Sequence, residues 1–234
     1  MCNSNYAPDG VADYTVMLML LSLRKYKPAL WRAQVNDYSL AGLQGRELRN
    51  LTVGILGTGK IGAAVIKNLS GFGCRILASD IRENPSLKGL CTYVDNETLY
   101  KACDIISLHM PLLESTRHFV NAETIAKMKD GVTIINCARG ELMNIPDMIR
   151  GIETQKIGAL ALDVFDKEDG IYHENRRDDI LSNRDMAYLR QFPNVIMTQH
   201  MAFYTDAAVQ SMVFCGIEGL CDFAKTGHTE TELV

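Results

Sequence analysis

Residues 51–80 read LTVGILGTGKIGAAVIKNLSGFGCRILASD, and this stretch decides the fold. Residues 52–56 are a short apolar run rich in β-formers, which predicts a buried strand. The glycine turn GTGKIG occupies residues 57–62, and apolar residues then recur at four-residue spacing, as they do on one face of a helix. Residues 74–79 predict a second strand. The stretch therefore predicts the order strand, glycine turn, helix and strand.

The glycine spacing has a physical reason. Gly57 permits the tight turn, a side chain at Gly59 would block a pyrophosphate, and Gly62 lets the helix pack on the sheet. The phosphates then lie at the helix N-terminus, where N–H groups and the dipole favour an anion. Asp80 ends the second strand, where a carboxylate accepts hydrogen bonds from ribose hydroxyls. The pattern predicts NAD rather than NADP, a preference that the nearby Arg82 softens.

Composition bounds the class of protein. With 234 residues, the chain suits one large domain or one domain and part of another. A hydrophobic fraction of 47% is ample for a core, and a net charge of -4 gives no basic footprint for nucleic acid. No apolar run appears long enough to span a membrane, and no signal peptide is recognisable. Seven cysteines without CxxC spacing predict reduced thiols in a cytoplasmic protein.

Strands and helices alternate along the rest of the chain. Further strands are expected over residues 104–109, 132–136, 158–164 and 195–198, and helices over 97–103, 121–128, 146–154 and 207–223. A helix over residues 11–25 is apolar nearly all round and is expected to be buried. Residues 25–50, 83–96 and 166–185 are expected to be irregular. The alternation predicts an α/β fold, a doubly wound parallel sheet.

Polar side chains stand at or just past the ends of these strands. They are Asp80, His109, Arg139, Asp163 and His200. Ligands of a doubly wound sheet bind beyond the carboxyl ends of its strands. We therefore expect one rim of the sheet to gather these residues, although none is adjacent to another in sequence.

The residue types at this rim suit the reduction of a 2-keto acid. Arg139 offers a planar, permanently charged fork for a carboxylate, and His200 can give a proton to a developing alkoxide and take it back. A nearby carboxylate would raise the pKa of His200. Spacing leaves four such carboxylates open: Asp166, Glu168, Asp169 and Glu174. Asp163 is a candidate for the nicotinamide end, and His109 and His118 either contact the cofactor or face solvent. The alternative for Arg139 is a surface ion pair, and for His200 a structural role.

Residues 6–224 resemble the D-isomer-specific 2-hydroxyacid dehydrogenases. The resemblance rests on YAPDGVAD (6–13), VGILGTGKIG (53–62), SLHMPL (107–112), NCARGEL (136–142), ALDV (161–164) and HMAFYT (200–205). It implies that Arg139 binds and polarises the substrate, that Glu168 pairs with the catalytic histidine, and that His200 is the acid/base. It also implies cofactor contacts from Lys60, Ile61, Asp80, Met110, Pro111, Thr116, Cys137, Ala138, Arg139 and Asp163.

The segment after the histidine indicates a branch of this family. Phe203-Tyr204-Thr205 resembles the D-lactate and D-2-hydroxyisocaproate dehydrogenases, including those of vancomycin-resistance clusters. This implies NAD-dependent reduction of a small 2-keto acid, pyruvate-like or branched, to the D-2-hydroxy acid and the reverse. The alternative is an NAD(H)-binding sensor or interaction protein without turnover. The resemblance also implies a homodimer formed through the cofactor domain, with the helix over residues 11–25 as a candidate interface.

The chain departs from the family pattern in several ways. The family's N-terminal segment, which builds most of the substrate domain, has no expected counterpart within these 234 residues. We therefore expect residues 1–204 to form the NAD-binding domain and residues 205–234 to belong to the largely absent substrate domain, with the activity of the chain alone left open. Gln199 and Met201 replace a usual proline and threonine beside His200, and both are able to shift its imidazole.

Overall fold

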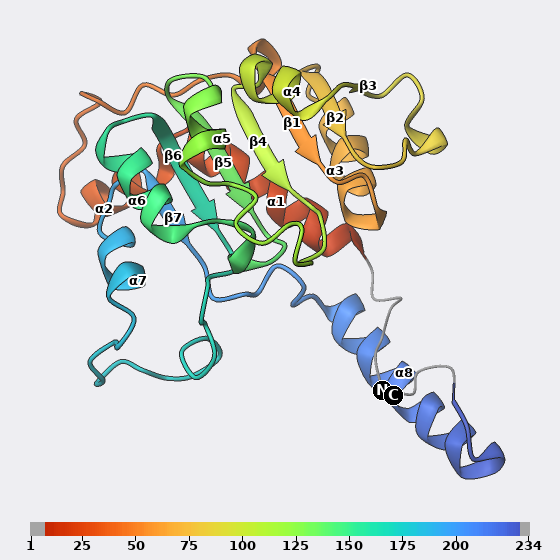
Figure 1. The fold of residues 1–234 in the computed structure, drawn as a ribbon. Helices are drawn as coiled ribbons and strands as arrows, with labels where there is room; N and C mark the ends of the chain where they lie inside the picture. The colour runs from red at the N-terminus through yellow and green to blue at the C-terminus, as the bar shows by residue number, and fades with distance from the viewer. Residues whose placement is uncertain (1–7, 230–234) are drawn as a thin grey trace.

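The computed structural model describes residues 8–229 (Figure 1). Its centre is a parallel sheet with the strand order β3-β2-β1-β4-β5-β6-β7. The strands are β1 (Thr52–Leu56), β2 (Arg75–Ser79), β3 (Thr92–Tyr93), β4 (Ile105–Leu108), β5 (Val132–Asn136), β6 (Ile157–Leu162) and β7 (Val195–Met197). The prediction of a parallel sheet is confirmed. Tyr6 and Ala7 of the first family-like segment, and residues 230–234 of the expected C-terminal part, lie outside the described residues.

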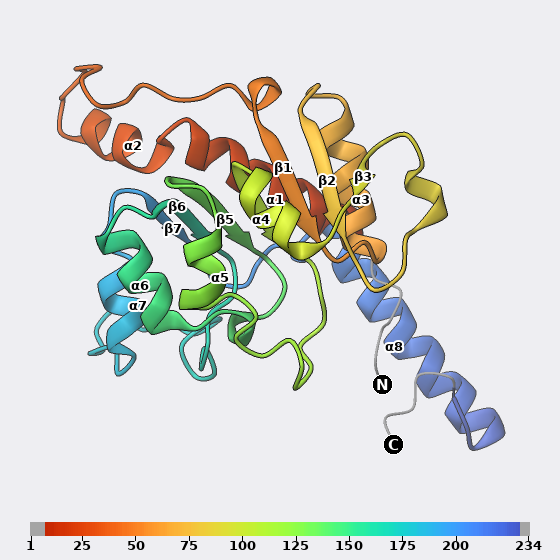
Figure 2. The same cartoon turned by 45° about the horizontal axis from the view of Figure 1, so that its top comes forward.

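Helices cover both faces of this sheet (Figures 1 and 2). One face carries α1 (Pro8–Leu23) and α3 (Lys60–Ser70), which share a core with Val53 and Ile55 of β1. The other face carries α4 (Asn96–Ala102), α5 (Ala122–Lys127) and α6 (Ile145–Glu153), which share a second core with Leu56. Strands buried on both faces are expected to be nearly continuous apolar runs, and the central strands are mostly apolar. The doubly wound architecture is therefore confirmed, including the burial of α1.

Three segments expected to be irregular contain regular structure. They hold α2 (Tyr26–Gln34) and the 3-10 turn η1 (Leu48–Asn50), η2 (Pro85–Leu87) and strand β3, and the start of α7 (Arg184–Leu189). No residue of α2 is buried, so the helix is not held by a buried apolar face. Instead Lys27 Nζ donates hydrogen bonds of 2.6–2.8 Å to the carbonyl oxygens of Arg190, Phe192 and Val195, more than 160 residues away. Such tertiary contacts leave no local pattern.

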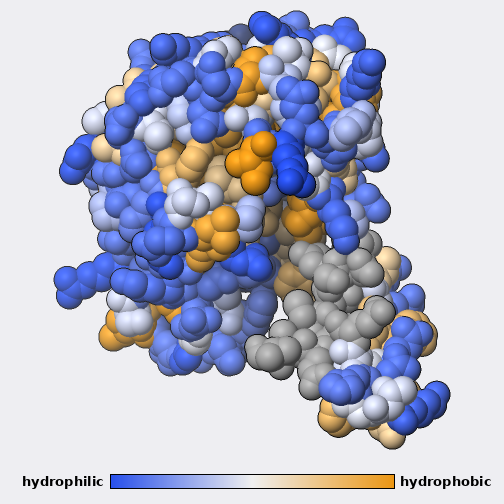
Figure 3. Space-filling model, turned by 45° about the vertical axis from the view of Figure 1, so that its right-hand side comes forward, coloured by the Kyte–Doolittle hydropathy of each residue, from blue (hydrophilic) through white to orange (hydrophobic). Residues whose placement is uncertain are grey.

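The last helix, α8 (Asp206–Thr226), confirms the expected closing helix but projects away from the body of the molecule (Figures 1 and 2). Only Ala208 and Gly219 are buried in it. Its exposed apolar side chains are Val213, Phe214, Ile217, Leu220 and Phe223. Hydrophobic atoms show on this projection and as scattered patches on a mainly hydrophilic body (Figure 3).

By length and composition α8 is apolar enough to cross a membrane, the one such helix among the described residues. The expectation that no apolar run reaches that length is wrong in this respect. Length and composition are weak criteria, because core helices of soluble proteins and signal sequences meet them too.

Candidate functional site

A cavity of about 640 Å³ opens at the carboxyl edge of the sheet, where the predicted rim lies. Ten residues singled out by sequence line it: Gly59, Lys60, Ile61, His109, Met110, Pro111, Cys137, Ala138, Arg139 and His200. The lining also includes Val11, Leu112, Phe203 and Met212, of which the first three lie in the family-like segments and Met212 carried no sequence signal. The structure thus brings Arg139 and His200 into one cavity.

The glycine turn fits a pyrophosphate. Gly57 has a φ of +95°, and a Cβ there would lie 2.7 Å from the backbone of His109. A Cβ on Gly62 would overlap the carbonyl oxygen of Gly57. Gly59, the N-cap of α3, has no atom within 4 Å of its Cβ position, so it faces open space at the start of the helix. A helix N-terminus with such an open approach suits an anionic group.

Asp80 lies beside this turn. Its Oδ2 accepts hydrogen bonds from the backbone N–H and the hydroxyl of Thr58, and its Oδ1 accepts one of 3.2 Å from Arg82 N. Burial raises the pKa of Asp80, but these bonds outweigh it and leave the pKa below its ordinary value. Asp80 is therefore ionised at neutral pH, as a ribose-binding carboxylate must be.

Thr116, predicted to bind the cofactor, and His109, left open between a cofactor contact and solvent, both belong to the segment that follows β4. Thr116 does not line the cavity; its Oγ1 donates to Pro111 O at 2.7 Å and accepts from Leu113 N at 2.8 Å, which closes the loop that carries Pro111. His109 faces the cavity and shares a 2.9 Å hydrogen bond with Ser107 Oγ. Burial lowers the pKa of His109 to about 4, so this imidazole is neutral at pH 7.

Arg139 is presented by a turn that Asn136 holds in shape. Asn136 is fully buried at the end of β5; its Nδ2 donates to Arg139 O at 2.8 Å and its Oδ1 accepts from Ala138 N at 2.9 Å. The Arg139 guanidinium is exposed and donates to Ala138 O at 2.7 Å. In the sequence, Asn136 is the polar residue that ends the predicted strand over residues 132–136, and this position is the signal that marks it as the support of the Arg139 turn. The charged fork remains available to a ligand in the cavity.

His200 contacts Glu168. His200 Nδ1 lies within hydrogen-bond distance of Glu168 Oε1, and Glu168 Oε2 accepts a 2.8 Å bond from Phe165 N. The hydrogen bond to Glu168 raises the pKa of His200. Burial raises the pKa of Glu168, but the bonds from His200 and Phe165 outweigh it and lower that pKa overall. The pair therefore favours an imidazolium beside a carboxylate. Gln199 and Met201 do not prevent this contact.

Asp163 is buried below the site rather than lining it. Its carboxylate accepts hydrogen bonds from Thr198 Oγ1 (2.6 Å), Met201 N (3.0 Å) and Ala202 N (2.8 Å), and its carbonyl oxygen accepts from His200 N (2.7 Å). All four donors belong to the segment that follows β7. Asp163 thus fixes the backbone on both sides of the imidazole.

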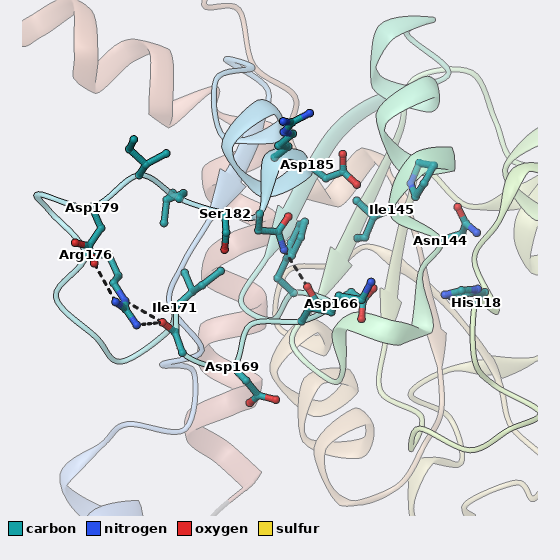
Figure 4. A pocket seen from close by; sticks show the side chains of 18 residues that line it. His118, Asn144, Ile145, Asp166, Asp169, Ile171, Arg176, Asp179, Ser182 and Asp185 are labelled. Carbon is teal, nitrogen blue, oxygen red and sulfur yellow. Dashed lines mark hydrogen bonds and ion pairs between the residues drawn. The ribbon is translucent and has the colours of Figure 1, made fainter.

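A second cavity, of about 870 Å³, lies beside the 166–185 loop and contains neither Arg139 nor His200 (Figure 4). Arg176 in this loop donates to Gly170 O at 2.9 and 2.6 Å and pairs with Asp179 at 2.9 Å. His118 lines this cavity and not the one at the rim. Two of the three other carboxylates considered for His200, Asp166 and Asp169, line it as well, and the third, Glu174, is exposed and lines neither cavity. The chemistry therefore belongs to the smaller cavity.

Known protein families and solved structures resemble this chain over most of its length. The sequence model of the protein family described as "D-isomer specific 2-hydroxyacid dehydrogenase, NAD binding domain" matches residues 16–202. The chain is 43% identical to an aromatic 2-oxoacid reductase of Clostridium sporogenes, over 98% of this chain and 70% of that protein. It is 37% identical to a D-lactate dehydrogenase of Curvularia clavata, over 98% and 66%. The solved structure of a D-lactate dehydrogenase from Sporolactobacillus sp. superposes with a TM-score of 0.92 at 34% identity, covering 98% of this chain and 69% of that one.

Proposed function

The chain belongs to the D-isomer-specific 2-hydroxyacid dehydrogenases, NAD-dependent oxidoreductases, and on this premise we propose that it reduces a 2-keto acid to the D-2-hydroxy acid and catalyses the reverse reaction. The observation that carries the proposal is the contact between His200 and Glu168 at a cavity that also holds Arg139. An imidazole kept protonated beside a guanidinium matches the needs of a keto acid: a proton for its carbonyl oxygen and a positive charge for its carboxylate.

The roles of the three residues follow from their contacts. Because Glu168 occupies Nδ1 of His200, Nε2 is the nitrogen that donates a proton to the carbonyl oxygen and recovers it in the oxidative direction. Glu168 raises the pKa of His200 and so keeps the acid form available. Arg139 binds the substrate carboxylate through its planar fork. The bound NADH supplies the hydride.

The cofactor-binding residues are proposed from the lining of this cavity and from residues that hold its surroundings in place. The glycine turn 57–62 and the start of α3 hold the pyrophosphate, and Asp80 binds the adenosine ribose. The remaining proposed contacts come from Met110, Pro111, Thr116, Cys137, Ala138, Arg139 and Asp163. Thr116 acts through the loop that it closes, and Asp163 through the segment that it anchors.

The side chain of the substrate is proposed to be apolar. Val11, Leu112, Phe203 and Met212 give the cavity an apolar wall. We propose pyruvate or a branched 2-keto acid as the substrate. The relative at 43% identity is named for aromatic 2-oxoacids, so phenylpyruvate tests the upper limit of side-chain size.

The test is NADH oxidation, followed by loss of NADH absorbance, with pyruvate, 4-methyl-2-oxopentanoate and phenylpyruvate in turn. Turnover that Arg139→Gln and His200→Gln each abolish supports the proposal. Absence of turnover with all three acids, in a protein that binds NADH, contradicts it and supports the alternative of an NAD(H)-binding sensor or interaction protein. The exposed apolar side chains of α8 favour that second function, because such surfaces commonly mark interaction sites.

Two further properties are proposed. Residues 1–204 form the NAD-binding domain and residues 205–234 a separate C-terminal part, since α8 leaves the body and is mostly exposed. We also propose a cytoplasmic homodimer. Most of α1 is excluded as its interface, because the majority of its apolar residues are buried, whereas Tyr26, Leu30 and Trp31 of α2 are 46–64% exposed. Light scattering coupled to size exclusion, with Trp31→Ala as the disrupting variant, tests the dimer.

A further inference from the structure

The backbone of His200 lies in a conformation that non-glycine residues seldom adopt. Its φ is +54°, in the left-handed region, where the Cβ of a residue with a side chain comes too close to the following carbonyl oxygen. Such strain persists where surrounding contacts hold it. One such contact, described above, is the hydrogen bond of 2.7 Å that His200 N donates to Asp163 O. The carbonyl of the same residue has its own partner, which the proposed mechanism does not use.

That partner is His173. His173 Nε2 lies 3.1 Å from His200 O. Because a carbonyl oxygen only accepts, Nε2 carries the hydrogen and donates it. The two imidazole rings are 6.0 Å apart, and Phe203 completes a cluster of three rings, with its centroid 6.3 Å from His173 and 6.1 Å from His200. The peptide groups on both sides of His200 are therefore held, one by Asp163 and one by His173.

The segment that carries His173 also carries Glu168. The backbone N–H groups of Ile171 and Tyr172 both donate to Glu168 O at 3.0 Å. Arg176 then binds Gly170 O, which closes the loop below them (Figure 4). One short turn thus delivers both the carboxylate that meets the imidazole of His200 and the donor that meets its carbonyl.

We propose that His173 is a positioning residue for His200: its hydrogen bond to the His200 carbonyl holds the left-handed conformation that presents Nδ1 to Glu168 and Nε2 to the cavity. The proposal rests on the proposed function, in which His200 is the acid/base. The charged and titratable groups that face His200 are Glu168, Asp163, Arg139 and His173. Of these, His173 alone contacts the carbonyl of His200.

Three variants distinguish a role of His173 as a hydrogen-bond donor from a role in packing alone. His173→Gln keeps an N–H donor of similar reach, His173→Phe keeps a ring without a donor, and Glu174→Gln changes the neighbouring exposed side chain as a control. The first readout is the pKa of His200 from a histidine NMR titration of the full chain, which has five histidines. The second is kcat and KM for the keto acid, and the third is the Kd for NADH.

We expect His173→Phe to lower the His200 pKa by about 0.5–1 unit, because a displaced imidazole loses part of its contact with Glu168. We expect it to lower kcat about 10-fold or more, with an unchanged NADH Kd. For His173→Gln, we expect the His200 pKa and kcat to stay near their wild-type values. The proposal is overturned if His173→Phe behaves like Glu174→Gln, or if His173→Gln loses as much as His173→Phe.

The readouts also separate this proposal from the one on which it rests. A wild-type chain that binds NADH but turns over no keto acid contradicts the proposed function, while the NMR titration still decides the role of His173. A wild-type enzyme whose His200 pKa and kcat are indifferent to His173→Phe contradicts the role of His173 alone.

Discussion

The backbone of Gly140 packs directly on the backbone of Phe165: a Cβ at position 140 would overlap the Phe165 carbonyl group and the amide nitrogen of Asp166. Gly140 follows Arg139 in the turn after β5, and Phe165 donates its N–H to Glu168 in the segment after β6. The segment that carries Arg139, proposed to bind the substrate, and the segment that carries Glu168, the partner of the histidine, are therefore fitted together at a point that only glycine satisfies.

The first prediction concerns this contact. Gly140→Ala is expected to lower the free energy of unfolding by at least about 2 kcal/mol, because the overlap is with backbone that cannot rotate away. Gly216→Ala in α8 is the matched control, since no atom lies within 4 Å of its Cβ position, and it should be neutral or slightly stabilising. Urea unfolding of both variants measures the difference; equal midpoints would contradict the close fit.

A second prediction concerns the guanidinium. Arg139→Gln should lower kcat/KM for the keto acid about 10²–10³-fold, because the carboxylate loses a charged, bidentate partner. The kcat/KM of Arg139→Lys should lie between those of the wild type and Arg139→Gln, because lysine keeps the positive charge but lacks the planar fork. Arg177→Gln removes an exposed arginine outside the cavity and serves as the control. Steady-state kinetics decide, and a loss confined to the NADH Kd would argue against carboxylate binding.

Cofactor preference gives a third prediction. Asp80→Asn is expected to weaken NADH binding about 10-fold and to narrow the preference for NADH over NADPH, because a carboxylate that repels a 2′-phosphate is removed. The asparagine oxygen can still accept from Thr58, so the glycine turn keeps its support. Glu83→Gln removes a nearby exposed carboxylate as the control. Fluorescence titration with both dinucleotides tests this; an unaltered Kd ratio would count against the role of Asp80.

Stability should depend on pH through the His200–Glu168 pair. The raised pKa of His200 contributes stability below its ordinary value of 6.5 that is lost as pH rises through the raised value. The lowered pKa of Glu168 contributes stability above its ordinary value of 4.5 that is lost as pH falls through the lowered value.

Glu168→Gln should therefore be least stable relative to the wild type between pH 4.5 and 6.5. The difference there should be about 1.5–3 kcal/mol, the contribution of a hydrogen bond to a charged group. Urea unfolding across pH measures it. A difference that stays constant from pH 4 to pH 9 would show that the pair is not ionised as described.

Much of the fold follows from local pattern. The glycine turn, the apolar strands and the Asn121 cap of α5 were all recognisable, because each rests on neighbours within a few residues. Lys27 could not be read as the anchor of α2, since its partners lie more than 160 residues later. The two-residue strand β3 is too short for an alternation pattern.

The site was predictable in its residues more than in its contacts. Strand ends place His200 and Arg139 at one rim, but spacing alone left four carboxylates as partners of the histidine. The family resemblance selects Glu168 among them, and the structure shows the turn that brings it to His200: Phe165 N donates to Glu168 Oε2 in a segment whose backbone packs on Gly140. His173 carried no signal, because its partner is a backbone carbonyl.

The most direct measurement of the central claim is the pKa of the His200 imidazole in the intact chain, determined by NMR titration of the wild type and of Glu168→Gln. The account predicts a value above 6.5 in the wild type and a clear fall in the variant, while the resonances of His118 and His228 stay unchanged. A wild-type value at or below 6.5, or one that Glu168→Gln does not move, would contradict it.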